Sequence, residues 1–147
     1  MKQVIEISNM TTFGEIMKDI LEQDNIIFSV RSGSAVCEAR TEQGLPFRIR
    51  EQWATIGDET KFWHIHVNIE ETVEAKFVKE NKSESGKVSF SIRFYDTNGN
   101  LTLRANFVKM YDSSNMIIQE RVSKYEEIFS KYGHRDKLLL ENSVKKP

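Results

Sequence analysis

The sequence predicts an α+β fold: a large meandering antiparallel β-sheet with one helix near each end of the chain. Two segments, one near each terminus, carry apolar residues at the three- and four-residue spacing of an amphipathic helix. Between them lie short runs rich in β-branched and aromatic residues, separated by turn signals. Strands grouped between terminal helices favour α+β over an alternating α/β arrangement.

The N-terminal helix is expected from residue 13 onwards. Thr12 and Glu15 have the spacing of a capping box, in which each side chain bonds the backbone N–H of the other residue. Asp24-Asn25 ends the helix. Its apolar face is formed by Phe13, Ile16, Met17, Ile20 and Leu21.

Several extended segments follow this helix. The predicted strands before the central hairpin span residues 26–31, 34–40, 47–56, 62–69 and 73–79. Gly33 marks a hairpin between the first two, and a polar loop is expected at residues 80–86.

The dipeptide Asn98-Gly99 predicts a type I′ hairpin turn, because both residues tolerate a positive φ. Counting outward from this turn pairs Phe94 with Leu103 on an apolar face. On the opposite face, the same count pairs Arg93 with Arg104. The other expected pairs are Ile92 with Ala105, Phe90 with Phe107, and Ser91 with Asn106.

A second helix is predicted over residues 115–132, with Gly133 suited to the position just after it. Its apolar stripe is Ile118, Val122, Tyr125, Ile128, Phe129 and Tyr132. We expect a single domain over residues 1–147, with its core at about 12–133 and a partly ordered tail at 134–147.

Charge and cysteine content limit the classes of partner. The net charge of -1 provides no overall field for nucleic acid or an anionic membrane, so neither is expected as a partner. The single cysteine, Cys37, excludes an intramolecular disulfide and is expected to be a small core residue in a reduced compartment. No segment is apolar enough for a signal peptide or a membrane span, so the expected location is the cytoplasm.

Two histidines are the first candidate functional residues. The strand at residues 62–69 alternates, so His64 and His66 share the face opposite its apolar residues, roughly 6.5 to 7 Å apart. Imidazole nitrogens bind iron, zinc or copper, or form hydrogen bonds around an anion. They also occur as part of an ordinary solvated strand face. With Glu70, the pair imitates the first metal motif of cupins, although Asp58 stands where that motif has glycine.

Arg93 and Arg104 are the second candidate, because like charges directly opposite in a ladder repel one another. A negative group is expected nearby. It is either a carboxylate from a neighbouring strand, such as Glu38 or Glu74, or a ligand carboxylate or phosphate bound by the guanidinium groups. Tyr95 is a candidate for the wall of such a pocket.

From about residue 13 to residue 133, the chain resembles the ChuX/HutX-like haem-utilisation proteins, which are relatives of the HemS-type haem carriers. The segments that carry the resemblance are 13–17, 34–39, 62–68, 77–78, 92–96 with Asn98-Gly99, and 131–133. It implies a HemS/ChuX-like α+β fold, usually dimeric, that binds haem and passes it on or stores it in the cytoplasm. The strand histidine of the family falls on His64, with His66 as the matching position in short relatives.

The resemblance also implies a second histidine, and Arg31 stands at its position. Arginine does not ligate iron, but it can pair with a propionate. We therefore hypothesise a haem-binding, haem-trafficking homodimer rather than an enzyme. His64 or His66 would ligate the iron, and Arg31, Arg93 or Arg104 would lie near the propionates. The alternatives are a cupin-like metal-dependent enzyme using His64, His66 and Glu70, or a dimeric sheet module that binds another small anionic ligand.

Overall fold

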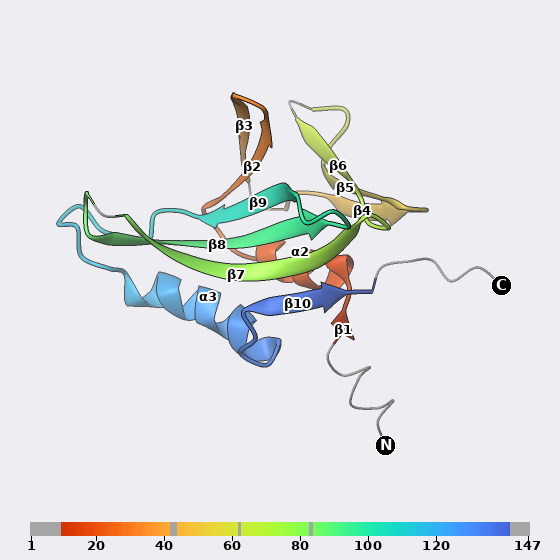
Figure 1. Cartoon of the computed structure of the whole chain (residues 1–147). Helices are drawn as coiled ribbons and strands as arrows, with labels where there is room; N and C mark the ends of the chain where they lie inside the picture. Colours follow the sequence, from red (N-terminus) through yellow and green to blue (C-terminus); the bar gives the residue numbers. More distant parts are fainter. Residues whose placement is uncertain (1–9, 42–43, 62, 83, 142–147) are drawn as a thin grey trace, which may run out of the picture.

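The computed structural model describes residues 10–41, 44–61, 63–82 and 84–141. Two helices and two β-sheets make up this part of the chain (Figure 1). The large sheet has seven strands in the order β1-β10-β7-β8-β9-β2-β3, and the small sheet has three in the order β4-β5-β6. All neighbours are antiparallel except β1 and β10. The α+β prediction is therefore confirmed.

The elements have the following bounds: β1 (Met10–Thr11), α2 (Phe13–Leu21), β2 (Ile26–Ser32), β3 (Ala35–Arg40), β4 (Phe47–Arg50), β5 (Trp53–Gly57), β6 (His64–Asn68), β7 (Thr72–Lys82), β8 (Lys87–Asp96), β9 (Leu101–Phe107), α3 (Gln119–Lys131) and β10 (Lys137–Leu140).

Both helices lie on one side of the large sheet, where they cover its apolar face (Figure 1). The capping box is present as predicted, with Thr12 Oγ1 accepting from the Glu15 N–H and Glu15 Oε1 accepting from the Thr12 N–H. The predicted face of α2 is buried at Phe13, Ile16, Met17 and Ile20. One continuous core therefore joins α2, α3 and both sheets.

Tyr125 of α3 is the centre of this core. Its ring contacts those of Phe77, Phe90 and Phe107 edge-on, at centroid distances of 5.8, 5.3 and 5.0 Å. Its hydroxyl donates to the backbone oxygen of Ser91 at 2.9 Å. Burial raises the pKa of the Tyr125 phenol above its ordinary value. The helix is thus fixed to the middle of β8 by both ring packing and a buried hydrogen bond.

The predicted register of β8 and β9 is confirmed at every pair, including Arg93 with Arg104. The turn type is wrong, because Gly99 has a positive φ of 80° but Asn98 does not. Instead, Oδ1 of Asp96 accepts hydrogen bonds from the N–H groups of Asn98 and Asn100. The loop is longer than a two-residue turn, and a register shift between Phe94 and Tyr95 compensates for the extra length. A carboxylate-supported turn and a compensating bulge give the same register further along the strands.

The predicted single strand at 47–56 is wrong, since it is a hairpin of β4 and β5 in the separate small sheet. The chain reverses at Glu51, which has a φ of 57°. Neither glycine nor proline marks this turn, so sequence patterning gives no signal for it. The strand predicted at 62–69 forms β6, although Phe62 itself lies outside the described residues.

Three boundaries also differ from the predictions. β7 continues to Lys82, so residues 80–82 of the expected 80–86 loop belong to a hairpin with β8. α3 begins at Gln119 rather than at residue 115, because Asn115 has a φ of 63° and a bridge pairs Tyr111 with Ile117. Within the expected tail, Lys137–Leu140 forms a strand inside the large sheet, and residues 142–147 lie outside the described part.

Cys37 is exposed, so its prediction as a core residue is wrong. The reason is that β3 ends the large sheet, where the helices do not cover it, and of its six residues only Ala39 is buried. Neither helix in the described residues is long and apolar enough to cross a membrane.

Candidate functional site

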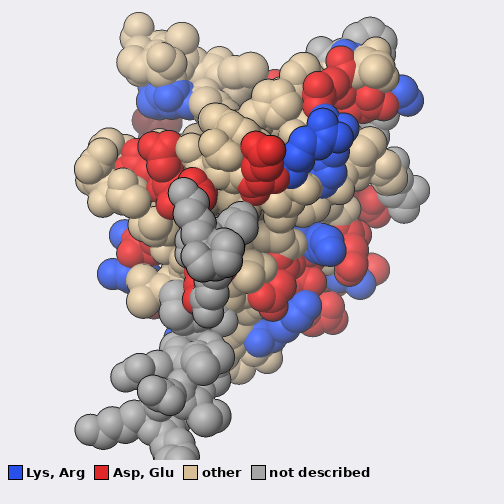
Figure 2. Space-filling view, turned by 90° about the vertical axis from the view of Figure 1, so that its right-hand side faces the viewer, with Lys and Arg blue, Asp and Glu red and all other residues tan. Residues whose placement is uncertain are grey.

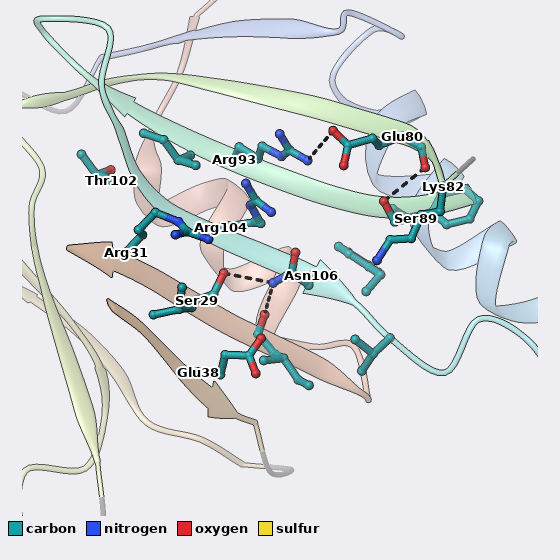
Figure 3. A pocket seen from close by; sticks show the side chains of 16 residues that line it. Ser29, Arg31, Glu38, Glu80, Lys82, Ser89, Arg93, Thr102, Arg104 and Asn106 are labelled. Carbon is teal, nitrogen blue, oxygen red and sulfur yellow. Dashed lines mark hydrogen bonds and ion pairs between the residues drawn. The ribbon is translucent and has the colours of Figure 1, made fainter. Parts of the chain in front are cut away.

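The polar face of the large sheet, opposite the helices, carries a pocket of about 560 Å³ (Figure 3). Its lining includes the charged residues Arg31, Arg93, Arg104, Lys82, Glu38 and Glu80. We call this site the arginine pocket. It brings together the three arginines that the sequence singled out.

Strand alternation explains why the arginines meet. Ile92 and Phe94 are fully buried against the helices, so Arg93 between them points to the other face. Leu103 and Ala105 orient Arg104 in the same way. Cross-strand pairing then places four residues in one row over β8, β9, β2 and β3, in the order Arg93, Arg104, Ser29 and Glu38.

Arg93 has partial compensation for its charge. Its side chain is 13% exposed, and its Nη2 lies 3.7 Å from Oε2 of Glu80. Its Nε donates to Oγ of Ser91 at 3.0 Å. The carboxylate that pairs with Arg93 is therefore Glu80, whereas Glu38, which the sequence suggested, lines the same pocket two strands away from Arg104. Glu74 pairs instead with Lys76 and Lys137, because it lies near the other end of β7.

Arg104 and Arg31 are different, because neither makes an ion pair or side-chain hydrogen bond within the described residues. Burial, and next the charge of Arg93, hold the pKa of the Arg104 guanidinium below its usual value. With four cationic side chains and two carboxylates, the lining has a net charge of +2. The pocket therefore favours a small dianion.

The histidines lie elsewhere. His64 and His66 are on β6 of the small sheet, both exposed, with their ring centroids 4.8 Å apart. His66 Nδ1 shares a hydrogen bond of 2.9 Å with Oγ1 of Thr55 on β5. Neither histidine lines the arginine pocket. Their common face is as predicted, but the structure does not bring them together with the arginines in one pocket.

Tyr95 also lies outside the pocket lining. It is half-buried, and Lys76 Nζ lies 4.7 Å from the centroid of its ring. The irregularity between Phe94 and Tyr95 shifts this residue against β9, so it pairs with Leu101.

The cupin-like metal site finds no support. Among the described residues, which include His64, His66 and Glu70, no three histidine, cysteine or acidic side chains are grouped so that they could hold a metal ion. Glu70 follows the end of β6, where its N–H donates to Oδ1 of Asn68. The chain therefore turns before the carboxylate could join the strand face that carries the imidazoles.

Acidic and basic side chains are interspersed on the molecular face drawn in Figure 2. This mixed pattern agrees with a net charge of -1 for the whole chain. On that face there is no extended surface of one sign. The lining of the arginine pocket has a net charge of +2 in a chain whose net charge is -1, so its positive charge is a local feature of the sheet.

A protein-family model matches residues 14–133, from the start of α2 to the glycine after α3. The structure is similar to the crystal structure of ChuX, with a TM-score of 0.69 and 16% identity over 84% of this chain and 73% of the other. The chain belongs to the ChuX/HutX-like haem-utilisation family. No curated protein matches its sequence.

Two further solved structures support the assignment of the fold. One, the structure of the haem-binding protein ChuX, has a TM-score of 0.67 and 16% identity, over 81% of this chain and 71% of the other. The other, a protein from Agrobacterium tumefaciens, has a TM-score of 0.66 and 20% identity, over 82% of this chain and 66% of the other. These structures share the fold of this chain, and the family resemblance seen in the sequence is confirmed by the family model over residues 14–133.

The sequence patterns gave no indication of three residues of these sites, namely Glu80, Lys82 and Thr55. Glu80 was expected in a loop, and only the extension of β7 to Lys82 turns its side chain toward Arg93. Thr55 had no distinguishing pattern, because its position opposite His66 depends on the unpredicted β4–β5 hairpin. Strand parity would have found Glu80 if the β7–β8 register had been known.

Proposed function

We propose that this protein binds haem and takes part in haem trafficking as a binding protein, not as an enzyme. The observation that carries the proposal is the arginine pocket, in which three guanidinium groups converge with incomplete compensation of their charge. ChuX, whose structure is similar, is a haem-binding protein, and this supports the choice of ligand.

The propionates are the groups that the pocket would hold. Haem carries two carboxylates on one edge, and a lining with a net charge of +2 complements them. Arg104 is half-buried and has no ion-pair partner in the described residues, so a ligand carboxylate would not have to displace one. Arginine binds carboxylates through two parallel hydrogen bonds, which orients the ligand as well as attracting it.

The iron would be ligated by an imidazole of β6. The lining of the arginine pocket contains no histidine, cysteine, methionine or tyrosine, which are the usual protein ligands of haem iron. His64 and His66 are exposed and presented from a neighbouring sheet. Arg31 stands at the family's second histidine position, which favours iron ligation from β6 alone.

We further propose that the protein delivers or stores haem and does not degrade it, that it acts in the cytoplasm, and that it forms a homodimer. Sedimentation velocity tests the oligomeric state. A single species of twice the 17.1 kDa chain mass is expected, and a monomer at all concentrations would contradict the dimer.

Titration with hemin, followed by visible absorption, tests the proposal. Wild-type protein should give a saturable spectral change, and His64→Ala combined with His66→Ala should remove it. The chain has three histidines, so His134→Asn is the matched control. His134 lies just after α3 with a φ of 57°, which asparagine tolerates, and its loss should leave the titration unchanged. No saturable change in wild type would overturn the proposal.

A second candidate is a pocket for a small anion with no role for iron, because the histidines and the arginine pocket are separate. Protoporphyrin IX without metal is the discriminating probe, since it has both propionates and lacks iron. Equal affinity for this compound and for hemin, unaffected by loss of the two histidines, would favour the second candidate. A large preference for hemin would favour the first.

A further inference from the structure

The two histidines of β6 have different neighbours on β5. His66 lies directly opposite Thr55, and His64 lies opposite Gly57, which has no side chain. Of the two, only His66 has a side-chain hydrogen bond within the described residues, between its Nδ1 and Thr55 Oγ1 at 2.9 Å. The ring of His64 instead meets that of His66 edge-on, at an interplanar angle of 64°.

The direction of the Thr55–His66 bond follows from the surroundings of Thr55. This residue is 5% exposed, so its hydroxyl hydrogen needs an acceptor within the protein. On β4 its cross-strand neighbour is Arg48, whose guanidinium can only donate. His66 Nδ1 is the sole hydrogen-bond partner found for Oγ1 among the described residues. These surroundings favour the hydroxyl as the donor and Nδ1 as the acceptor.

A neutral imidazole that accepts at Nδ1 carries its hydrogen on Nε2. The exposed nitrogen of His66 is then an N–H donor, which can bond an anionic oxygen but offers no lone pair to a metal. Ligation through Nε2 would require loss of the Thr55 bond or a change of tautomer. His64 is under no such restriction.

We propose that Thr55 is a positioning residue that holds His66 as an Nε2–H donor for a carboxylate or other anionic group of the ligand, leaving His64 as the imidazole that ligates iron. This division of roles rests on the haem-binding function proposed above. The tautomer of His66 does not depend on that function, because it is a property of the ligand-free protein.

Nitrogen-15 NMR of the ligand-free protein tests the tautomer directly. In mildly alkaline buffer, the spectrum of His66 should show a protonated Nε2 and an unprotonated, hydrogen-bonded Nδ1. Thr55→Ser keeps the hydroxyl and should preserve this pattern. Thr55→Val keeps the β-branched shape of a buried strand residue and should remove the hydrogen-bond shift at Nδ1. A proton on Nδ1 in wild type would overturn the proposal.

Hemin titration of single variants tests the roles. His64→Ala should abolish the absorption typical of imidazole-ligated haem. His66→Ala should retain that absorption with affinity reduced by roughly two- to tenfold, the effect of one hydrogen bond. Loss of the ligated spectrum in His66→Ala, with retention in His64→Ala, would overturn the assignment. If wild type shows no hemin binding, the haem function and the role of His64 fail together, while the NMR result still decides the tautomer.

Discussion

Arg93 and Glu80 approach each other on the polar face of the sheet, with Nη2 and Oε2 3.7 Å apart (Figure 3). The arginine is largely buried and the glutamate is 58% exposed. This distance is too long for a hydrogen bond and the Glu80 carboxylate is largely in water, so the ion pair is weak. Glu80 thus lies beside Arg93, where the proposed ligand carboxylate would bind, without holding Arg93 strongly.

Replacing Glu80 by glutamine should therefore strengthen ligand binding. The change removes a negative charge that competes with the ligand for Arg93. Since an exposed ion pair of this kind contributes about 0.2–1 kcal/mol, its removal should raise the affinity by up to roughly fivefold. Hemin titration measures it at low and high salt, and the gain should shrink as salt rises. Glu127→Gln, at an exposed position on α3, is the matched control. Weaker binding by Glu80→Gln would show that the carboxylate assists the ligand.

Replacing Arg104 by glutamine should weaken binding without loss of stability. Arg104 faces Arg93 across the ladder, and removing one of two opposed like charges should leave the free energy of unfolding unchanged or raise it by roughly 0.5 kcal/mol. Loss of a charge-assisted bond to a carboxylate should reduce affinity at least about tenfold. Denaturant unfolding and hemin titration measure the two effects.

The control for Arg104 is Arg135→Gln, at an exposed site just beyond α3. It removes the same charge from the chain and should change neither quantity. Parallel losses of stability and affinity in Arg104→Gln would instead mean that the arginine is structural.

Tyr125→Phe tests the link between α3 and the sheet. The substitution keeps the ring contacts with Phe77, Phe90 and Phe107 but removes the hydrogen bond to the Ser91 oxygen. We expect a loss of about 1 kcal/mol in the free energy of unfolding, against about 3–5 kcal/mol for Tyr125→Ala. Urea denaturation checks both. Equal losses for the two variants would show that the rings contribute little.

Stability should fall at alkaline pH. The pKa values of Tyr125 and Tyr132 are raised above the ordinary value of 10.0, chiefly by burial. Because the folded state then keeps protons that the unfolded state releases, this contribution is complete below pH 10.0 and is lost as pH rises above it. Unfolding free energies at a series of pH values should decrease less steeply in Tyr125→Phe than in wild type. An identical slope would contradict the assignment.

Gly57→Ala should disturb the strand that presents His64. Gly57 has a φ of 97°, and an added Cβ would lie 2.8 Å from the backbone oxygen of Trp63. Strain and clash together should cost roughly 2–3 kcal/mol. Gly33→Ala is the control, since its φ is 59° but no atom lies within 4 Å of an added Cβ, and it should cost roughly 1 kcal/mol. Thermal unfolding compares the two, and equal costs would exclude the clash with Trp63.

The part of the fold predicted from sequence is the part governed by local rules. The capping box fixed the start of α2, and alternation identified which residues of β6 and β8 face the core. The hairpin register was correct although its turn was not, because an extra residue in the turn was offset by an irregularity one step away. Boundaries without glycine or proline, such as the turn at Glu51, were missed.

The sequence by itself determined the α+β class, the family, the apolar face of the sheet and the outward direction of Arg93, Arg104, His64 and His66, because two-residue alternation is local. Only the tertiary structure decided which of these meet. In the folded chain, one pocket is lined by Arg31, Arg93, Arg104 and Glu80. The two histidines lie on the other sheet, where Thr55 forms a hydrogen bond with His66. Strand order and sheet membership depend on long-range pairing, which no local pattern encodes.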